Sequence, residues 1–302
     1  MNGPNRFTIT ETEPTPLLCD FQSFLDYIGA NKPYLTPKGY ISGKDLFEVN
    51  KRMIHPLEGT TSRTGQEFYP QFHLFFHLAQ AGRLIQKASG KGNKAILELS
   101  DRAKHYSALT PTERYFFLLE TLWVDTNWKH IDVSIFKRND ALRVIPILQR
   151  LAGKTPNLPI HAGHLVSLPE ALGYFWLYFS LFGFWTVTEN KEIIPYSKRS
   201  FHPAMVTPLP IGVTLVRLLI SERNYTTWNL AFRRGLGEWG ILPGEPLPVE
   251  HRIGLNPLRV LGTMSGKKRG TVQKDQSGES FHLPFVSLFP EGELVNTLPR
   301  ET

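Results

Sequence analysis

Cysteine is almost missing from this chain, whose 302 residues include only Cys19. A single cysteine excludes an internal disulfide framework and a zinc finger built on cysteine ligands. The first residues, MNGPNRFTITETEPTP, also lack an apolar segment, so no secretory signal is predicted. We therefore expect a cytoplasmic protein without structural disulfides.

The sequence also lacks the motifs of the common enzyme classes. It has no G-x-S-x-G elbow, and its acidic residues form no pair at a persuasive catalytic spacing. Residues 235–240 satisfy G-x-G-x-x-G, but they close a helix rich in Trp and Phe, whereas a dinucleotide site follows a strand. Residues 262–268 have too few positions between their glycines for a Walker loop. These absences favour a protein without catalytic activity, and we expect no cofactor.

One apolar stretch approaches the length of a membrane span. Residues 171–188 carry no charge over 18 positions, which is the lower limit for crossing a bilayer. Gly, Tyr, Ser and Thr interrupt the run, and Gly183 divides it into a helical part and a strand-like part. A buried helix followed by a strand fits this pattern better, so no membrane contact is predicted.

Aromatic residues and positive charge, by contrast, are plentiful. Hydrophobic residues make up 41% of the chain and aromatic residues 12%, which predicts a well-packed core rather than disorder. Lysine and arginine outnumber aspartate and glutamate by 34 to 27, giving a net charge of +7. This balance favours contact with a polyanion such as DNA, although many proteins that bind no nucleic acid share it.

The stretch from Phe68 to Trp128 predicts the element order of a winged helix-turn-helix. Pro70 suits a first helical turn, and that helix should end at Gly82. Residues 83–87 and 95–99 are apolar runs that predict two strands joined by a basic, Gly-rich loop, the wing. Two further helices should follow. The buried stripe of the first helix is expected to be Phe72, Phe75, Phe76 and Ala79.

Capping residues predict where the neighbouring helices begin. Residues 17–28 have helical spacing and Gly29 follows as a stop, while Ser42 should cap a helix that buries Leu46, Val49 and Met53. Thr110 and Glu113 form a capping-box pattern. The helix after it should bury Tyr115, Leu118, Leu119 and Leu122.

The same order recurs after residues 153–159, the predicted linker. Ser167 should cap an aromatic helix ending at Gly183, residues 184–188 should form a strand, and Thr207-Pro208 should open another helix. Residues 81–85 then correspond to 182–186, and residues 108–111 to 205–208, with a third partial copy near Trp228. We predict an α+β, mainly α fold of tandem winged-helix-like units. The predicted domains are 1–152 and 160–302, the second with a β- and loop-rich C-terminal region.

Two segments, LTPKGYISGKDLFEVN and LTPTERYFFLLETLWVDTNW, carry a family resemblance. The first 130 residues resemble the helical, winged-helix-like domain of the plasmid Ri open-reading-frame-3 family. The matching residues are Leu35, Thr36, Gly39, Tyr40, Gly82, Thr110, Pro111, Trp123, Asn127 and Trp128. The resemblance implies a bacterial or plasmid-borne protein and no catalytic residue.

Basic residues are the candidate nucleic-acid contacts. Lysines in the wing would lie along phosphates, with Gly90 and Gly92 letting the backbone approach closely. The full candidate set is Lys44, Lys51, Arg52, Lys87, Lys91, Lys94, Arg233, Lys267, Lys268 and Arg269. Solvated loops on a mildly basic protein would give the same pattern. The helices at 42–53 and 111–123 are not rich in the Arg, Asn, Gln and Ser of recognition helices.

Two histidine pairs are the candidate metal ligands. His73 and His77 stand four residues apart on one helix, but HLFFH lacks the Glu of a zincin and a third ligand at a telling spacing. Partly buried histidines beside the core are the simpler interpretation, and His161 and His164 in a loop are interpreted alike.

Three hypotheses follow. The first is a non-enzymatic nucleic-acid-binding or regulatory protein, with DNA as its partner. The second is a protein-interaction scaffold that uses the same fold without touching DNA. The third is a metal-dependent enzyme at His73 and His77.

Overall fold

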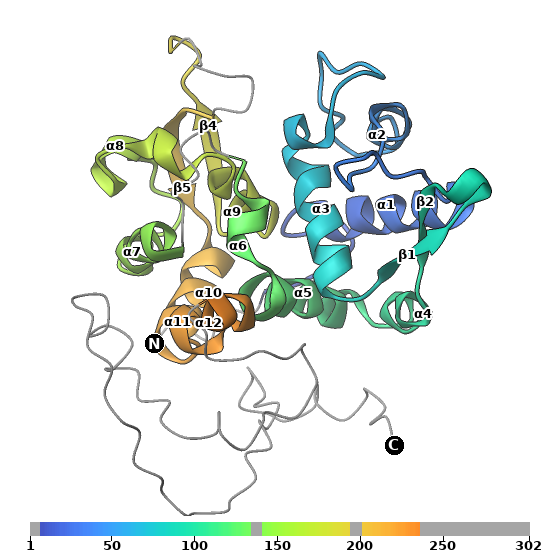
Figure 1. Ribbon diagram of the computed structural model, residues 1–302. Helices are drawn as coiled ribbons and strands as arrows, with labels where there is room; N and C mark the ends of the chain where they lie inside the picture. The colour runs from blue at the N-terminus through green and yellow to red at the C-terminus, as the bar shows by residue number, and fades with distance from the viewer. Residues whose placement is uncertain (1–6, 134–140, 194–200, 236–302) are drawn as a thin grey trace, which may run out of the picture. The chain divides into compact units, whose positions relative to one another are not determined.

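The structure is a computed structural model that describes residues 7–133, 141–193 and 201–235 (Figure 1). The chain forms two compact units, residues 1–243 and 244–302, and every described residue belongs to the first. The predicted linker at 153–159 lies inside that first unit. Helix accounts for 53% of the structure and strand for 12%, which confirms a mainly α, α+β fold.

The first segment runs helix, isolated β-bridge, helix, helix, hairpin, helix, helix. Residues 33–35 lie beside strand β2, where the amide of Leu35 donates to the carbonyl of Ala95 at 2.9 Å and that of Leu97 to Pro33 at 3.0 Å. Strands β1 and β2 pair antiparallel. The elements are α1 (Leu17–Asn31), α2 (Gly43–Asn50), η1 (Gln66–Phe68), α3 (Pro70–Ala81), β1 (Ile85–Ser89), η2 (Lys91–Asn93), β2 (Ala95–Leu99), α4 (Asp101–Ser107) and α5 (Pro111–Glu120).

Local signals place most helix starts of this segment. The Ser42 hydroxyl accepts from the Asp45 amide, Pro70 is the first residue of α3, and Thr110 and Glu113 complete a capping box. Each such cap contributes about 1 kcal/mol. The predicted stop at Gly29 is wrong, because α1 continues to Asn31 and ends at the left-handed Lys32. Strand β1 begins two residues later than predicted, since the helix end occupies residues 82–84.

The second segment is joined to the first by a π-helical turn, η3 (Thr121–Asp125), and by α6 (Trp128–Ile131). Its strand order, β3-β5-β4, places the short first strand beside the second strand of the hairpin. The elements are α7 (Ala141–Ala152), β3 (Ile160–His161), α8 (Ala162–Leu165), η4 (Pro169–Leu172), α9 (Phe175–Leu181), β4 (Trp185–Glu189), β5 (Pro203–Pro208), α10 (Pro210–Ser221), α11 (Tyr225–Trp228) and α12 (Leu230–Gly235).

Two predicted helix starts in this segment are wrong. Ser167 caps no helix, because the turn η4 begins after Leu168 and Gly173, at φ 51°, separates η4 from α9. Thr207-Pro208 ends strand β5 instead of opening a helix, and α10 begins at Pro210. Pro208 and Pro210 would each suit the first turn of a helix. Because residues 203–208 pair with β4, the helix begins at Pro210.

Equivalent hydrogen bonds end the helix that precedes each hairpin. The amide of Leu84 donates to Ala79 at 2.8 Å, and that of Phe184 donates to Phe179 at 3.0 Å. A residue with positive φ follows each helix: Arg83 after α3, at φ 56°, and Gly183 after α9, at φ 72°.

Equivalent bonds also mark where each following helix starts. The amide of Ser100 donates to Leu84 at 2.9 Å and that of Leu209 to Phe184 at 3.1 Å, so α10 is the counterpart of α4. The predicted match between residues 108–111 and 205–208 is therefore wrong.

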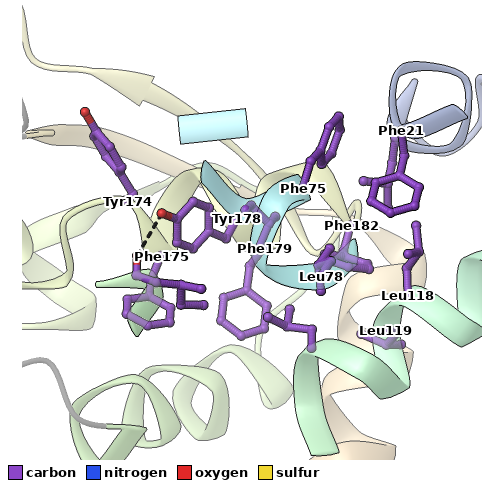
Figure 2. Close-up of a cluster of buried hydrophobic side chains, with 14 of the residues drawn as sticks. Phe21, Phe75, Leu78, Leu118, Leu119, Tyr174, Phe175, Tyr178, Phe179 and Phe182 are labelled. Atoms are coloured by element: carbon purple, nitrogen blue, oxygen red, sulfur yellow. Dashed lines mark hydrogen bonds between the residues drawn. The ribbon is translucent and has the colours of Figure 1, made fainter. Parts of the chain in front are cut away.

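A shared aromatic core joins the segments (Figure 2). Helix α3 packs against α9, α6 and η3 as well as α1. The buried Tyr115 hydroxyl of α5 donates to the carbonyl of Phe182 at 2.5 Å, and the Tyr178 hydroxyl of α9 donates to Ile131 at 2.9 Å. The aromatic run at 171–188 is thus η4, α9 and the start of β4, and its large side chains lie in this core.

Helix α10 lies directly against Phe184, the residue that precedes strand β4. A Cβ atom at Gly212 would come within 2.0 Å of the Phe184 carbonyl oxygen and 2.3 Å of its Cα. Only glycine permits this approach, because the backbone of Phe184, which accepts from the Leu209 amide, cannot move aside as a side chain does.

We expect Gly212→Ala to destabilise the protein even though alanine favours helix by about 1 kcal/mol over glycine. The clash with the Phe184 backbone should outweigh that gain and lower the free energy of unfolding by about 1–3 kcal/mol, measured by chemical denaturation. The control is Gly29→Ala in α1, where a Cβ meets only the movable Leu99 side chain, at 2.9 Å. Equal losses in both variants would contradict this account.

Candidate nucleic-acid interface

The β1–β2 hairpin gathers the basic residues predicted for the wing. Lys87 on β1 and Lys91 and Lys94 at the tip are all exposed. The Lys87 ammonium nitrogen lies 3.8 Å from the position of a Cβ at Gly39, so the hairpin adjoins the turn at 36–39. That turn is closed by the Gly39 amide, which donates to the Thr36 carbonyl at 2.8 Å.

The turn adds a lysine that the predicted set omitted. Lys38 is exposed one residue before Gly39. We call Lys38, Lys87, Lys91 and Lys94 the hairpin lysines. Within the described residues, none of the four forms an ion pair with a carboxylate. At the other end of the sheet Glu98 pairs with Lys32 at 3.5 Å and accepts from Gln86 at 3.0 Å, so the free positive charge lies toward the tip.

An exposed tyrosine lies beside one of these lysines, Lys94. Tyr34 bridges to Ile96 on β2, and its side chain is 45% exposed. The Lys94 ammonium stands 5.7 Å from the centroid of its ring. At Gly90 a Cβ would lie 2.6 Å from Ile96 and 3.3 Å from the Tyr34 ring, so glycine is what lets the tip close against this surface. Sequence reasoning missed Tyr34, although its position between Lys32 and Lys38 was a usable signal.

The predicted basic residues of α2 are exposed like the hairpin lysines, but two of them already have partners. Lys44, Lys51 and Arg52 are exposed on or beside α2, but Lys51 pairs with Glu48 at 2.8 Å and Arg52 stacks on a tyrosine ring.

Arg233 is 7% exposed and donates to the Thr227 carbonyl at 3.1 Å. Its side chain is therefore too buried to contact a phosphate group. Lys267, Lys268 and Arg269 lie outside the described residues.

Helix α3, which precedes the hairpin, has no broad face open to solvent. Residues 72–76, 78 and 79 are buried, and of the twelve helical positions only Gln80 is fully exposed. Figure 1 shows α3 between α1 on one side and α9 and α6 on the other. A helix enclosed in this way has no row of side chains to place in a DNA groove.

The predicted metal pair lies on the same buried helix. The rings of His73 and His77 are 4.6 Å apart, and Tyr40 packs edge-on against both. His73 Nδ1 and His77 Nε2 are buried without a hydrogen-bond partner among the described residues, and His73 Nε2 lies 3.3 Å from the His130 carbonyl. Burial lowers the pKa of His73 to about 4, and burial with the neighbouring His73 and His130 lowers the pKa of His77. Both imidazoles are therefore neutral at physiological pH.

No set of three or more His, Cys, Asp or Glu side chains in the described part of the chain is arranged to hold a metal. His161, in the second predicted pair, instead accepts from the Gly163 amide at 3.2 Å and so caps the short helix α8.

No protein-family model, curated protein or solved structure matches this chain. The resemblance to the plasmid Ri open-reading-frame-3 family therefore stays a prediction. Over residues 7–133, 141–193 and 201–235, none of the helices has both the length and the apolarity that crossing a bilayer requires.

The histidine pair predicts acid sensitivity. Unfolded histidines take up protons near pH 6.5, whereas folded His73 does so only near pH 4, so stability is full above pH 6.5 and falls between these values. The shift at His73 alone corresponds to about 3 kcal/mol lost across that range. Urea denaturation at stepwise lower pH measures the slope.

The double variant His73→Leu and His77→Leu should flatten this pH dependence, since leucine carries no proton. The control His105→Leu changes an exposed histidine of α4 and should keep the wild-type slope. An unchanged slope in the double variant would place the acid sensitivity elsewhere.

Proposed function

We propose that this chain is a non-enzymatic nucleic-acid-binding or regulatory protein made of two winged-helix-like units, and that its first hairpin contacts phosphate groups. The recurring order of helix, short strand, helix, helix and hairpin supports this architecture. So does the placement of the short strand beside the second hairpin strand in both segments. The bacterial or plasmid setting implied by the family resemblance is part of the proposal.

One observation carries the proposal: the four hairpin lysines lie together, and none pairs with a carboxylate of the described residues. Lysine ammonium groups bind phosphate as point charges and release condensed counterions when they do. Glycines at 90 and 92 keep the tip free of bulk, and Gly92, at φ 68°, has open space where a side chain would begin. The hairpin can therefore approach a sugar-phosphate backbone closely.

The burial of α3 limits how sequence is read. In a winged helix the helix before the hairpin normally supplies base contacts in the major groove. Here that helix lies in the core between the segments, and its position suits packing rather than recognition. We therefore expect binding that depends on phosphate contacts and discriminates weakly among sequences.

Replacing Lys87, Lys91 and Lys94 together by Gln should weaken binding to DNA and reduce its salt dependence. Each lost phosphate contact lowers the slope of log K against log salt by about 0.7–0.9, so the slope should fall by roughly 2–3. Fluorescence anisotropy with a labelled oligonucleotide at several salt concentrations measures both quantities.

The matched control changes three exposed lysines outside the hairpin, Lys104, Lys129 and Lys154, to Gln. It alters net charge equally and should leave the slope near the wild-type value. Equal losses in the two triple variants would show that net charge, rather than the hairpin, attracts DNA. Retained binding in the hairpin variant would place the DNA contact on another surface, whereas absence of DNA binding by the wild type would favour the protein-interaction scaffold.

A further inference from the structure

Tyr34 is one of two aromatic side chains in the described part of the chain that are exposed, the other being Phe7. The remaining aromatic residues mostly fill the core. Tyr34 alternates along its strand with the buried Pro33 and the half-buried Leu35, so its ring points away from the core. An aromatic ring on the outer face of a sheet contributes little to folding, because it stays in water.

The surroundings of the ring are those of a nucleic-acid surface. The Lys94 ammonium lies over the ring at 5.7 Å, and the tip backbone at Gly90 supports its edge. Lys91 adds positive charge at the tip, while Lys87, paired with Leu97, lies on the other face of the sheet toward the turn at 36–39. Proteins that bind single-stranded nucleic acid combine aromatic side chains, on which the bases stack, with basic residues that contact the backbone.

We propose that this surface binds single-stranded nucleic acid, with one unpaired base stacked on Tyr34 and the hairpin lysines along the adjacent backbone. This inference rests on the proposed function and specifies its substrate class. On binding, the base takes the position above the ring that Lys94 holds in the free protein, and the Lys94 ammonium pairs with a neighbouring phosphate.

A duplex cannot use the tyrosine in this way. Its bases are covered above and below by their neighbours, so an exposed ring finds no free base face except at an end. With α3 enclosed, the hairpin offers a duplex only phosphate contacts. A single strand gains the same phosphate contacts and the stacking contribution in addition, which sets the order of affinities.

Stacking tolerates any base, since every base has a π face. The platform should therefore show little sequence preference beyond that set by stacking strength. This agrees with a site that has phosphate-binding lysines but no groove-reading helix.

The test compares a labelled oligothymidylate with a duplex of matched length at one salt concentration, using anisotropy. We expect tighter binding of the single strand. Tyr34→Ala should reduce single-strand affinity by roughly 5- to 100-fold and leave duplex affinity within about twofold. Tyr34→Phe keeps the ring and should bind like the wild type, and Phe7→Ala, at the other exposed aromatic residue, should also leave binding unchanged.

The unchanged duplex affinity shows that Tyr34→Ala is folded. Equal affinity of Tyr34→Ala and wild type for the single strand would overturn this inference, while a salt slope that still depends on the hairpin lysines would leave the proposed function standing. Absence of binding to either oligonucleotide would overturn both. A loss in Tyr34→Phe as large as in Tyr34→Ala would overturn stacking as the cause.

Discussion

Burial of helix α3 on both sides is the constraint on which the arrangement of this protein depends. Its aromatic side chains fill the space against α1, while α6, η3 and α9 cover its other face. Beside this helix, polar side chains of η3 and of the second segment pair with backbone groups across the two segments. The Trp123 indole donates to the Arg223 carbonyl at 2.7 Å, and the Asn229 amide donates to Trp123 at 2.7 Å and Thr126 at 3.1 Å. Such pairs fix the relation of the elements more sharply than apolar contact alone.

This constraint divides the surface into two kinds of region. The side chains of α3 are largely taken up by packing, so exposed polar groups lie on segments that project from the core. The hairpin and the turn at 36–39 are such segments, and their lysines form no ion pair with a carboxylate among the described residues. The histidines of α3, by contrast, are neutral and enclosed, which suits a structural role.

Helix starts that depend on residues within one turn could be predicted from the sequence, whereas features that depend on tertiary packing could not. Ser42, Pro70 and the Thr110 capping box act within one helical turn, so their residue types suffice. Ser167 carries the same kind of signal and fails, because the chain there forms a turn and a left-handed Gly173.

The candidate site shows the same division. The lysines of the wing were predictable because a basic, Gly-rich loop between two apolar runs is a local pattern. The burial of Arg233 and the exposure of Tyr34 depend on neighbours distant in sequence, namely the packing around α12 and the pairing with Ile96. Periodicity carries no information about those partners.

The two hairpins end in the same closing bond, from Gly90 to Lys94 and from Asn190 to His202, both at 2.7 Å, yet they enclose segments of unequal length. Three residues stand between the bonded pair in the first hairpin and eleven in the second. The entropy of closing a loop rises only slowly with its length, so the paired strands tolerate either separation. The bond from Asn190 to His202 therefore marks a pair of positions between which chain length can change without loss of the sheet.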